Sequence, residues 1–411
     1  MTEGVEETVR EFRLRAASWI ADVLPSWDDE PADSHALQQL LFEQGFAGLA
    51  FPKEYGGAGL TLEHQKAFFD EAALQDKQVP TTFSVSIGMI APTILDHGSH
   101  EAKLRFLPPI LRGDQRWIQL LSEPRGGSDM AGATTRLVRD GESYILNGAK
   151  MWSSGAYEAD YGLCLCRSAW DLPKHRGLTT IAVPLKDTTG LSVKRTRAAS
   201  GRLGDFCEEF FDDVTLPADY LIGAENEGWA VAQSLLFHER NAVGGIGYGY
   251  LNGRRTRGPK VKYGAVPADL IAADARERGT LAGVSTNVVD AYIESIVGPM
   301  TSARVMTGMR VGTHQGQWGS LSKLQSTVAA QASVRTALAA MGADGVIWDG
   351  EILDPDNIGV TWLESRGGTI AGGTNEMQRN IISERLLGLP REPSVDRDLP
   401  FEEVLRNIRR A

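Results

Sequence analysis

LLSEPRGGSDMAG (residues 120–132) and LNGAKMWSSGA (residues 146–156) are the two stretches that decide the fold. The segment that joins them, ATTRLVRDGESYI, consists of two short β-rich runs separated by Asp140 and Gly141. Two such runs around an Asp-Gly pair predict a β-hairpin. Because similar short β-rich runs continue to about residue 220, we expect a small β-domain over residues 119–225.

Helical periodicity lies on both sides of this β-region. Apolar residues recur at helical spacing from about residue 35 to 118 and again from about 226, where the pattern ends in SERLLGLPR. Gly388 and Pro390 form a helix stop there. The order predicts an α+β multidomain protein, with helical domains before and after a β-domain. The expected boundaries are 1–118, 119–225, 226–395 and, for a tail, 396–411.

Composition argues against several partners and sites. With a net charge of −11, the chain has no sequence-wide positive field to attract nucleic acid or an anionic membrane. It has no run of about 18 apolar residues and no amino-terminal signal pattern, so we expect no membrane span and a cytoplasmic location. Cys164 and Cys166 alternate along YGLCLC, which predicts core residues on one strand face and no metal site. The basic segment 251–264 is expected to be a solvated loop, with phosphate binding as the alternative.

The two opening stretches carry groups suited to a large polar ligand. Gly126, Gly127 and Ser128 let backbone N–H groups approach closely, as in loops that bind pyrophosphate, although an ordinary turn is the alternative. Trp152 offers a flat surface, and Ser153 and Ser154 place hydroxyl groups beside it. A planar ring with polar edges would fit there, and the alternative is a core tryptophan.

Five segments resemble, in order along the chain, the signature segments of acyl-CoA dehydrogenases. They are FPKEYGGAG (51–59), FLPPILRGD (106–114), SEPRGGSD, NGAKMWSS and GGTNEMQRNIISERLLGLP (372–390). The resemblance extends from about residue 45 to 391. It implies a helical amino-terminal domain, a middle β-barrel-like domain and a carboxy-terminal four-helix bundle, with FAD between the last two domains and a neighbouring subunit.

Carried over position by position, the resemblance implies a set of FAD-binding residues. They are Leu121 and Ser122 along the flavin ring, Gly127 and Ser128 near the pyrophosphate and the CoA arm of the substrate, Trp152 and Ser154 at the reactive edge, and Thr374 and Glu376 in the GGTNE segment. The family usually has threonine where Ser122 and Ser154 stand, and serine keeps the hydroxyl group.

The catalytic base is not in its commonest place. Many members carry a glutamate just before the Gly-Thr pair, where this chain has Gly372. A subset typified by isovaleryl-CoA and long-chain dehydrogenases takes the base from a Glu-Arg pair on another helix, and LLFHERNAVGG contains Glu239 and Arg240. The resemblance thus implies Glu239 as the base. Arg240 would anchor the substrate or the base, or be structural, and His238 is expected at the helix surface.

Helical geometry supports Glu239 without the resemblance. One helix face is formed by Trp229, Ala232, Leu236, Glu239 and Val243. A carboxylate on this apolar face is partly desolvated, which raises its pKa and strengthens it as a base. The alternative is a helix-end glutamate paired with an arginine.

The implied reaction is FAD-dependent α,β-dehydrogenation of an acyl-CoA thioester to the trans-2-enoyl-CoA. Glu239 would remove the α-proton, and the backbone N–H of Gly372, with a ribityl hydroxyl of FAD, would polarise the thioester oxygen. An electron-transfer flavoprotein or a similar acceptor would reoxidise the flavin. The alternatives are a non-catalytic scaffolding subunit and an oxygen-using flavoenzyme of the same fold.

A second departure concerns the neighbouring subunit. Family members grip their neighbour's FAD through Arg-Gln-Phe-Gly and Gln-x-x-Gly-Gly segments. The region around 285–300 lacks the first, and the second reads AAMGA at 339–343. We therefore expect a hetero-oligomer, an α2β2 assembly with a second acyl-CoA dehydrogenase-like subunit. Such enzymes resemble actinobacterial dehydrogenases that shorten steroid side chains, which favours a bulky acyl-CoA.

Overall fold

The computed structural model describes most of the chain in two compact units. The described residues are 7–26, 32–201, 203–243, 248, 266–314, 317–346, 358–394 and 396–408. Unit 1 comprises Met1–Arg195, Asp205–Arg255 and Ser394–Ala411, and unit 2 comprises Thr196–Gly204 and Thr256–Pro393. The basic segment 251–264 lies outside the described residues.

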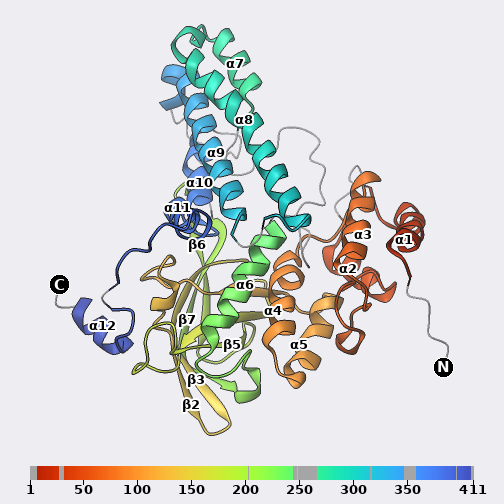
Figure 1. Ribbon diagram of the computed structural model, residues 1–411, viewed down its shortest axis with the longest axis vertical. Helices are drawn as coiled ribbons and strands as arrows, with labels where there is room; N and C mark the ends of the chain where they lie inside the picture. Colours follow the sequence, from red (N-terminus) through yellow and green to blue (C-terminus); the bar gives the residue numbers. More distant parts are fainter. Residues whose placement is uncertain are drawn as a thin grey trace. The chain divides into compact units, whose positions relative to one another are not determined.

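Unit 1 begins with five helices (Figure 1). They are α1 (Val9–Val23), α2 (Ser34–Glu43), α3 (Leu62–Leu74), α4 (Ala91–His97) and α5 (His100–Arg112). Local capping explains where several of them begin: the Thr8 hydroxyl accepts a hydrogen bond from the Glu11 N–H, and Ser99 does the same for Ala102. Phe12, Phe46 and Phe68 join the apolar core that α1, α2 and α3 share.

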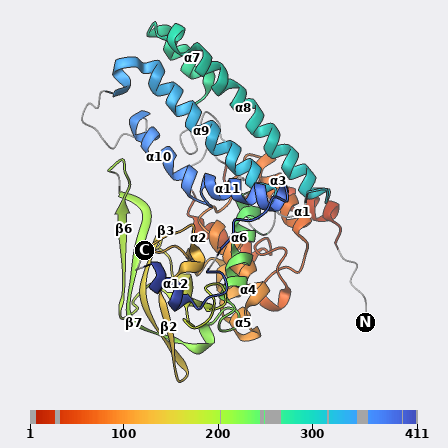
Figure 2. The same cartoon turned by 60° about the vertical axis from the view of Figure 1, so that its left-hand side comes forward.

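A seven-stranded sheet follows, in the order β1-β4-β2-β3-β7-β6 with β5 paired to β4. The strands are β1 (Trp117–Leu120), β2 (Arg136–Asp140), β3 (Ser143–Ser154), β4 (Tyr161–Arg167), β5 (Leu178–Pro184), β6 (Leu191–Arg197) and β7 (Leu203–Pro217). The predicted hairpin is confirmed, because β2 and β3 pair antiparallel with Asp140 opposite Ser143 and Gly141 at φ 60°. Cys164 and Cys166 are fully buried in the sheet's core, as predicted. Figure 2 shows β2, β3 and β7 side by side.

Helix α6 (Gly228–Val243) packs within unit 1. Val231 and Leu235 are buried in the core that includes residues of α4, α5 and the sheet. The domain division predicted from the sequence stays a prediction, and the structure groups this helix with the sheet rather than with the later helices. The apolar face of α6 is covered by α4 and β5, which explains the grouping. Part of the predicted tail forms α12 (Phe401–Ile408), where the Phe401 ring lies 4.1 Å from the Arg167 guanidinium carbon.

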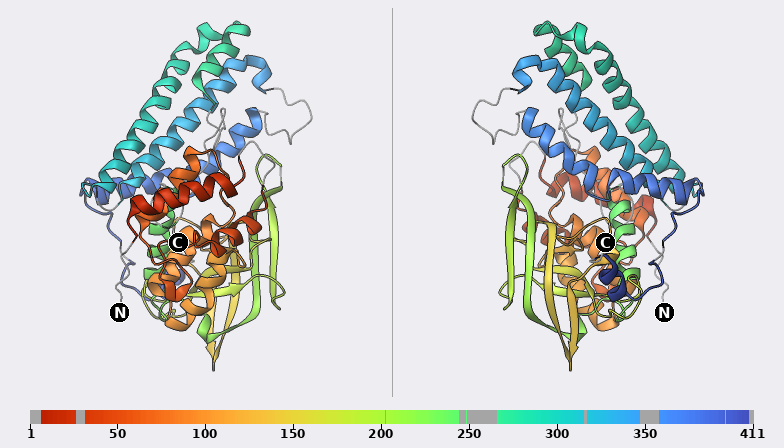
Figure 3. Two further views of the ribbon diagram at one scale, coloured as in Figure 1. Left: turned by 90° about the vertical axis from the view of Figure 1, so that its right-hand side faces the viewer. Right: turned by 90° about the vertical axis from the view of Figure 1, so that its left-hand side faces the viewer.

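The described part of unit 2 is mainly helical. It contains α7 (Ala268–Glu277), α8 (Leu281–Arg310), α9 (Gly319–Met341), α10 (Ile358–Ile370) and α11 (Asn375–Ile381). Helices α8 and α9 run side by side in both views of Figure 3. A π-helical turn at Ile382–Leu386 follows α11, and Gly388 just beyond it has φ 68°. The helix stop predicted at this point is therefore confirmed. No helix among the described residues is both long and apolar enough to cross a membrane.

Candidate functional site

The loop after β1 lies against β3, so the structure brings together the two stretches singled out from the sequence. The carbonyl of Ser122 accepts a hydrogen bond from the Met151 N–H at 3.0 Å. Residues 123–126 form a tight turn, and Gly127 follows it so closely that a Cβ there would lie 3.1 Å from the Ser122 hydroxyl oxygen. Gly127 and Ser128 are exposed, and Leu121 is half-buried. The ordinary-turn alternative therefore describes residues 123–126, whereas Gly127 and Ser128 remain open to a ligand.

A buried ion pair that we did not predict holds this loop. The Lys150 ammonium, on β3, donates to Glu123 Oε1 at 2.9 Å and to the Leu121 carbonyl at 3.1 Å. Burial raises the pKa of Glu123, but the charge of Lys150 and hydrogen bonds from Thr135 and Thr134 outweigh burial and lower this pKa to about 2. The signal in the sequence was one charged residue in each of the two opening stretches, Glu123 in 120–132 and Lys150 in 146–156.

Trp152 is presented outward by a β-bulge. The β3–β7 register places Met151 opposite Glu208 and Ser153 opposite Cys207, so Trp152 has no residue opposite it. It has φ 67° and is 54% exposed, which excludes the alternative that Trp152 is a core residue of this chain. Ser154 is exposed as well.

Ser153 turns the other way from the exposed ring beside it. Its hydroxyl is buried and donates to Glu209 Oε2 at 2.9 Å. The two hydroxyls that we expected beside the ring are therefore divided: Ser154 is exposed and Ser153 is bound in the interior. Glu209 is a further residue that sequence reasoning missed.

Glu239 has the environment predicted for a base. It lies half-buried on α6, and burial is the largest influence on its pKa, which is raised. The Gln119 side chain on β1 and the charge of Arg240 oppose this rise. Burial lowers the pKa of Arg240 in turn, and the charge of Glu239 opposes that change. Ala232, one of the predicted stripe residues, is fully buried, and the Val243 side chain lies outside the described part.

The expected surface position of His238 is wrong. The residue is 6% exposed, and its Nε2 lies 2.8 Å from Asp96 Oδ2 on α4. The same oxygen accepts a hydrogen bond from the Ser234 hydroxyl at 2.9 Å. The cause is the packing of α4 against α6, which covers this side of the helix and supplies the carboxylate.

In unit 2 the GGTNE segment is a turn followed by a helix start. Gly372 and Gly373 have φ 65° and 87°, a region that glycine adopts without strain. Their carbonyls accept hydrogen bonds from Gln378 Nε2 at 3.0 and 3.1 Å. Thr374 caps α11 by accepting from the Met377 N–H at 3.2 Å. Because Glu239 and Gly372 belong to different units, their joint action on one thioester stays a prediction.

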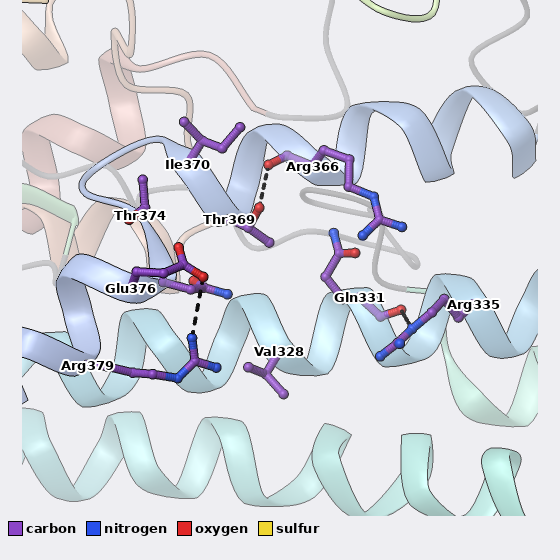
Figure 4. A pocket seen from close by; sticks show the side chains of 10 residues that line it. Val328, Gln331, Arg335, Arg366, Thr369, Ile370, Thr374, Glu376 and Arg379 are labelled. Carbon is purple, nitrogen blue, oxygen red and sulfur yellow. Dashed lines mark hydrogen bonds and ion pairs between the residues drawn. The ribbon is translucent and has the colours of Figure 1, made fainter. Parts of the chain in front are cut away.

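A pocket of about 430 Å³ lies between α9, α10 and α11 (Figure 4). Thr374 and Glu376, both predicted to hold FAD, are among the residues that line it. Among its described lining residues, the arginines Arg335, Arg366 and Arg379 outnumber the single carboxylate, Glu376. A guanidinium presents five donors and matches phosphate geometry, so the pocket suits an anionic group such as a diphosphate.

Comparison with known proteins agrees with this arrangement. Three family models match successive parts of the chain: the acyl-CoA dehydrogenase N-terminal domain at residues 2–114, the middle domain at 119–214 and the C-terminal domain at 269–387. The chain belongs to the acyl-CoA dehydrogenase family. This confirms the resemblance and the fold class, with a helical amino-terminal domain, a middle sheet domain and a helical carboxy-terminal domain. It also makes the protein an oxidoreductase of an FAD-binding family.

Named relatives include dehydrogenases of mycobacteria. The chain is 31% identical over 407 residues to the acyl-CoA dehydrogenase IpdE1 of Mycobacterium tuberculosis, covering 94% of this chain and 99% of that protein. It is 32% identical to FadE34 of the same organism, over 86% of this chain and 46% of FadE34. Among solved structures, the Tcur3481-Tcur3483 steroid ACAD (acyl-CoA dehydrogenase) matches with a TM-score of 0.68 and 26% identity, over 95% of this chain and 100% of that one. The ChsE4-ChsE5 complex from M. tuberculosis matches with a TM-score of 0.64 and 27% identity, also over 95% and 100%.

The residues present fit FAD, which the family implies. An exposed aromatic ring on a bulge, two exposed residues after a tight turn, and an arginine-lined pocket beside a helix start supply a stacking surface, backbone donors and positive charge. In unit 1 the residues that the resemblance assigns to FAD are Leu121, Ser122, Gly127, Ser128, Trp152 and Ser154, and in unit 2 they are Thr374 and Glu376.

Proposed function

We propose that this chain catalyses the α,β-dehydrogenation of an acyl-CoA thioester to the trans-2-enoyl-CoA, with Glu239 as the base. The observation that carries the proposal is a half-buried glutamate on an apolar helix face, with a pKa raised by burial, in a chain whose position 372 is glycine. The Glu239 carboxylate takes the proton next to the thioester carbonyl. FAD, when bound, supplies the acceptor for the hydride that leaves the β-carbon.

The remaining chemistry belongs to groups that make the α-proton acidic enough. A carboxylate cannot remove the α-proton of an unactivated thioester, so negative charge on the carbonyl oxygen must be stabilised. The Gly372 N–H is our candidate donor, and loss of such a donor typically costs about 3 kcal/mol, or about 100-fold in rate. Arg240, beside the base, is proposed to anchor the substrate or Glu239, and Ser128 to contact the CoA arm.

We further propose that the arginine-lined pocket holds the phosphate end of FAD. Support comes from the position of Thr374 and Glu376 in its lining and from the charge of Arg335, Arg366 and Arg379. The Glu376 carboxylate lies 3.7 Å from Arg379, so binding of an anion would compete with this exposed pair.

The assembly proposed is an α2β2 heterotetramer with a second acyl-CoA dehydrogenase-like subunit. The chain lacks the two segments through which family members grip a neighbour's FAD. Helix α8 also exposes a stripe of large apolar residues, each 42–66% exposed. The stripe consists of Val289, Tyr292, Ile293, Ile296, Val297 and Met300. Such a stripe on a soluble chain is typical of a subunit interface.

The substrate proposed is a bulky acyl-CoA such as a steroid side-chain thioester, and the acceptor an electron-transfer flavoprotein or a similar protein. Support for the substrate is the likeness to a solved steroid acyl-CoA dehydrogenase at 26% identity over nearly the whole chain. The test is to co-express the chain with its partner, count FAD, and follow anaerobic bleaching of flavin absorbance with a steroid side-chain acyl-CoA and with a short straight-chain acyl-CoA.

We expect about one FAD per two chains and faster bleaching with the bulky substrate. Glu239→Gln should retain FAD and lower the bleaching rate by about 10²- to 10⁴-fold, the range typical of a positioned general base. A homotetramer with one FAD per chain would overturn the heteromeric assembly. A colourless complex would indicate a scaffolding subunit, and turnover supported only by oxygen would indicate an oxidase or monooxygenase.

A further inference from the structure

Glu209, in the middle of β7, is a buried acid that the proposed reaction does not use. Its side chain is fully buried, between strand residues that belong to the sheet's apolar core. Oε2 accepts the hydrogen bond from Ser153, whereas Oε1 has no hydrogen-bond partner among the described residues. A buried polar atom without a partner destabilises the folded protein, and more so when it is charged. This cost indicates a functional reason for an acid at this position.

The nearest cation is already occupied. Lys150 stands opposite Glu209 in the β3–β7 register, but its ammonium donates to Glu123 and to the Leu121 carbonyl. The other ionisable groups that influence Glu209 are Glu208 beside it on β7, whose charge raises its pKa, and the Cys207 thiol, whose own pKa Glu209 raises. The charge of Lys150 thus acts on two buried carboxyl groups, those of Glu123 and Glu209, but its ammonium donates its hydrogen bond to Glu123.

The Ser153–Glu209 hydrogen bond lies directly beside the β-bulge at Trp152. Ser153 directly follows Trp152, the bulged residue with φ 67°. A non-glycine residue with left-handed backbone is sterically disfavoured and persists only where its surroundings hold it. The buried Ser153 hydroxyl is such a holding point, because it ties the residue after the bulge to the next strand.

We propose that Glu209 is a positioning residue: by binding Ser153 on the core side of the sheet, it keeps Trp152 and Ser154 turned toward the flavin. The inference rests on the proposed function, in which those two residues lie at the reactive edge of FAD. It adds a residue that touches neither cofactor nor substrate and acts through the bulge.

The site is also sensitive to pH. Burial raises the pKa of Glu209 to about 7, and the hydrogen bond from Ser153, the backbone N–H of Glu209 itself and the charge of Lys150 oppose this rise. Below this pH the carboxyl is neutral and suits its apolar surroundings. Above it the buried charge has one oxygen without a partner, so the bulge and the flavin edge that it carries are expected to rearrange.

The experiment uses the FAD-loaded complex of this chain with its partner. Flavin absorbance is recorded from pH 6 to pH 8, and FAD affinity is measured by titration. We expect the spectrum of the unaltered complex to change with a midpoint near pH 7. Glu209→Gln keeps the size of the side chain and an oxygen that can accept from Ser153 but cannot ionise, so its spectrum should not change over this range and its FAD affinity should stay within about twofold.

Glu209→Leu removes the partner of Ser153 without placing a charge in the core. We expect FAD affinity to fall about 5-fold, since a buried hydrogen bond contributes on the order of 1 kcal/mol. Ser153→Ala should have the same effect, and the double variant should lose no more than either alone. Glu208→Gln, at the neighbouring half-buried residue, is the control for FAD affinity and should match the unaltered complex in that measurement. Because the charge of Glu208 raises the pKa of Glu209, the same variant should move the spectral midpoint to lower pH.

Two results would overturn the inference. If the unaltered complex is yellow but its flavin spectrum does not change from pH 6 to 8, and if Glu209→Leu binds FAD as tightly as Glu208→Gln, Glu209 does not position the flavin edge. In that case the proposed dehydrogenation still stands on the Glu239→Gln result. A complex that binds no FAD at all would overturn both the inference and the proposed function.

Discussion

Lys150→Met tests whether the buried ion pair with Glu123 holds the loop that follows β1. The Lys150 and Glu123 side chains are 0% and 6% exposed, so removing the ammonium leaves a buried carboxylate without a cation. Breaking one partner of such a pair costs about 3–5 kcal/mol. The pKa of Glu123 gives a similar figure, because its fall from 4.5 to about 2 corresponds to about 3 kcal/mol of stability at neutral pH.

The pH dependence has a definite sign. Because the pKa of Glu123 is lowered in the folded protein, the stability that it contributes is present above pH 4.5 and is lost as the pH falls through about 2. In Lys150→Met the unpaired carboxylate takes up a proton more readily. The stability difference between this variant and the unaltered protein is therefore largest at neutral pH and shrinks as the pH falls toward 4.

The assay is thermal unfolding of the complex, followed by circular dichroism at several pH values. At neutral pH the midpoint should fall by at least about 6 °C, since 1 kcal/mol corresponds to roughly 2–4 °C for a domain of this size. Lys186→Met is the matched control: this lysine pairs with Asp160 at 2.6 Å but is 57% exposed, so its loss should cost less than about 1 kcal/mol. Adding Glu123→Gln to Lys150→Met should restore part of the midpoint. If Lys150→Met melts within a degree of Lys186→Met, the pair does not stabilise the loop.

Three further predictions concern the cofactor and the base. Trp152→Ala should weaken FAD binding and shift the flavin absorbance with little change in the far-ultraviolet circular dichroism, and an unchanged spectrum at full occupancy would remove Trp152 from the flavin site. Arg366→Gln should lower FAD affinity at least about 10-fold, because a hydrogen bond to a charged group contributes about 1.5–3 kcal/mol, whereas Arg406→Gln on α12 should leave affinity unchanged. Burial raises the pKa of Glu239, and only the ionised form of this residue accepts a proton. The bleaching rate should therefore rise with pH, with a midpoint above pH 4.5. Gln119→Leu removes a group that lowers this pKa, so it should move the profile to higher pH, and an unmoved profile would show that Gln119 does not act on the base.

The sequence by itself determined the features that arise from neighbouring residues. Helical and alternating periodicities predicted the order of helices and strands, Asp140 and Gly141 predicted the hairpin, and Gly388 the end of the last helix in unit 2. The same local reasoning placed Glu239 on an apolar helix face, and the rise of its pKa by burial follows from that placement.

Only the tertiary structure decided which polar side chains are buried together. Ser153 and Glu209 are 56 positions apart, and Asp96 and His238 are 142 positions apart. Strand and helix periodicity says which face a residue occupies, but the partner that lies across that face comes from a distant segment brought in by packing. For this reason the sequence predicted His238 at the surface and no role for Glu209. The partner of His238 is Asp96 on α4, and the partner of Glu209 is Ser153 on β3.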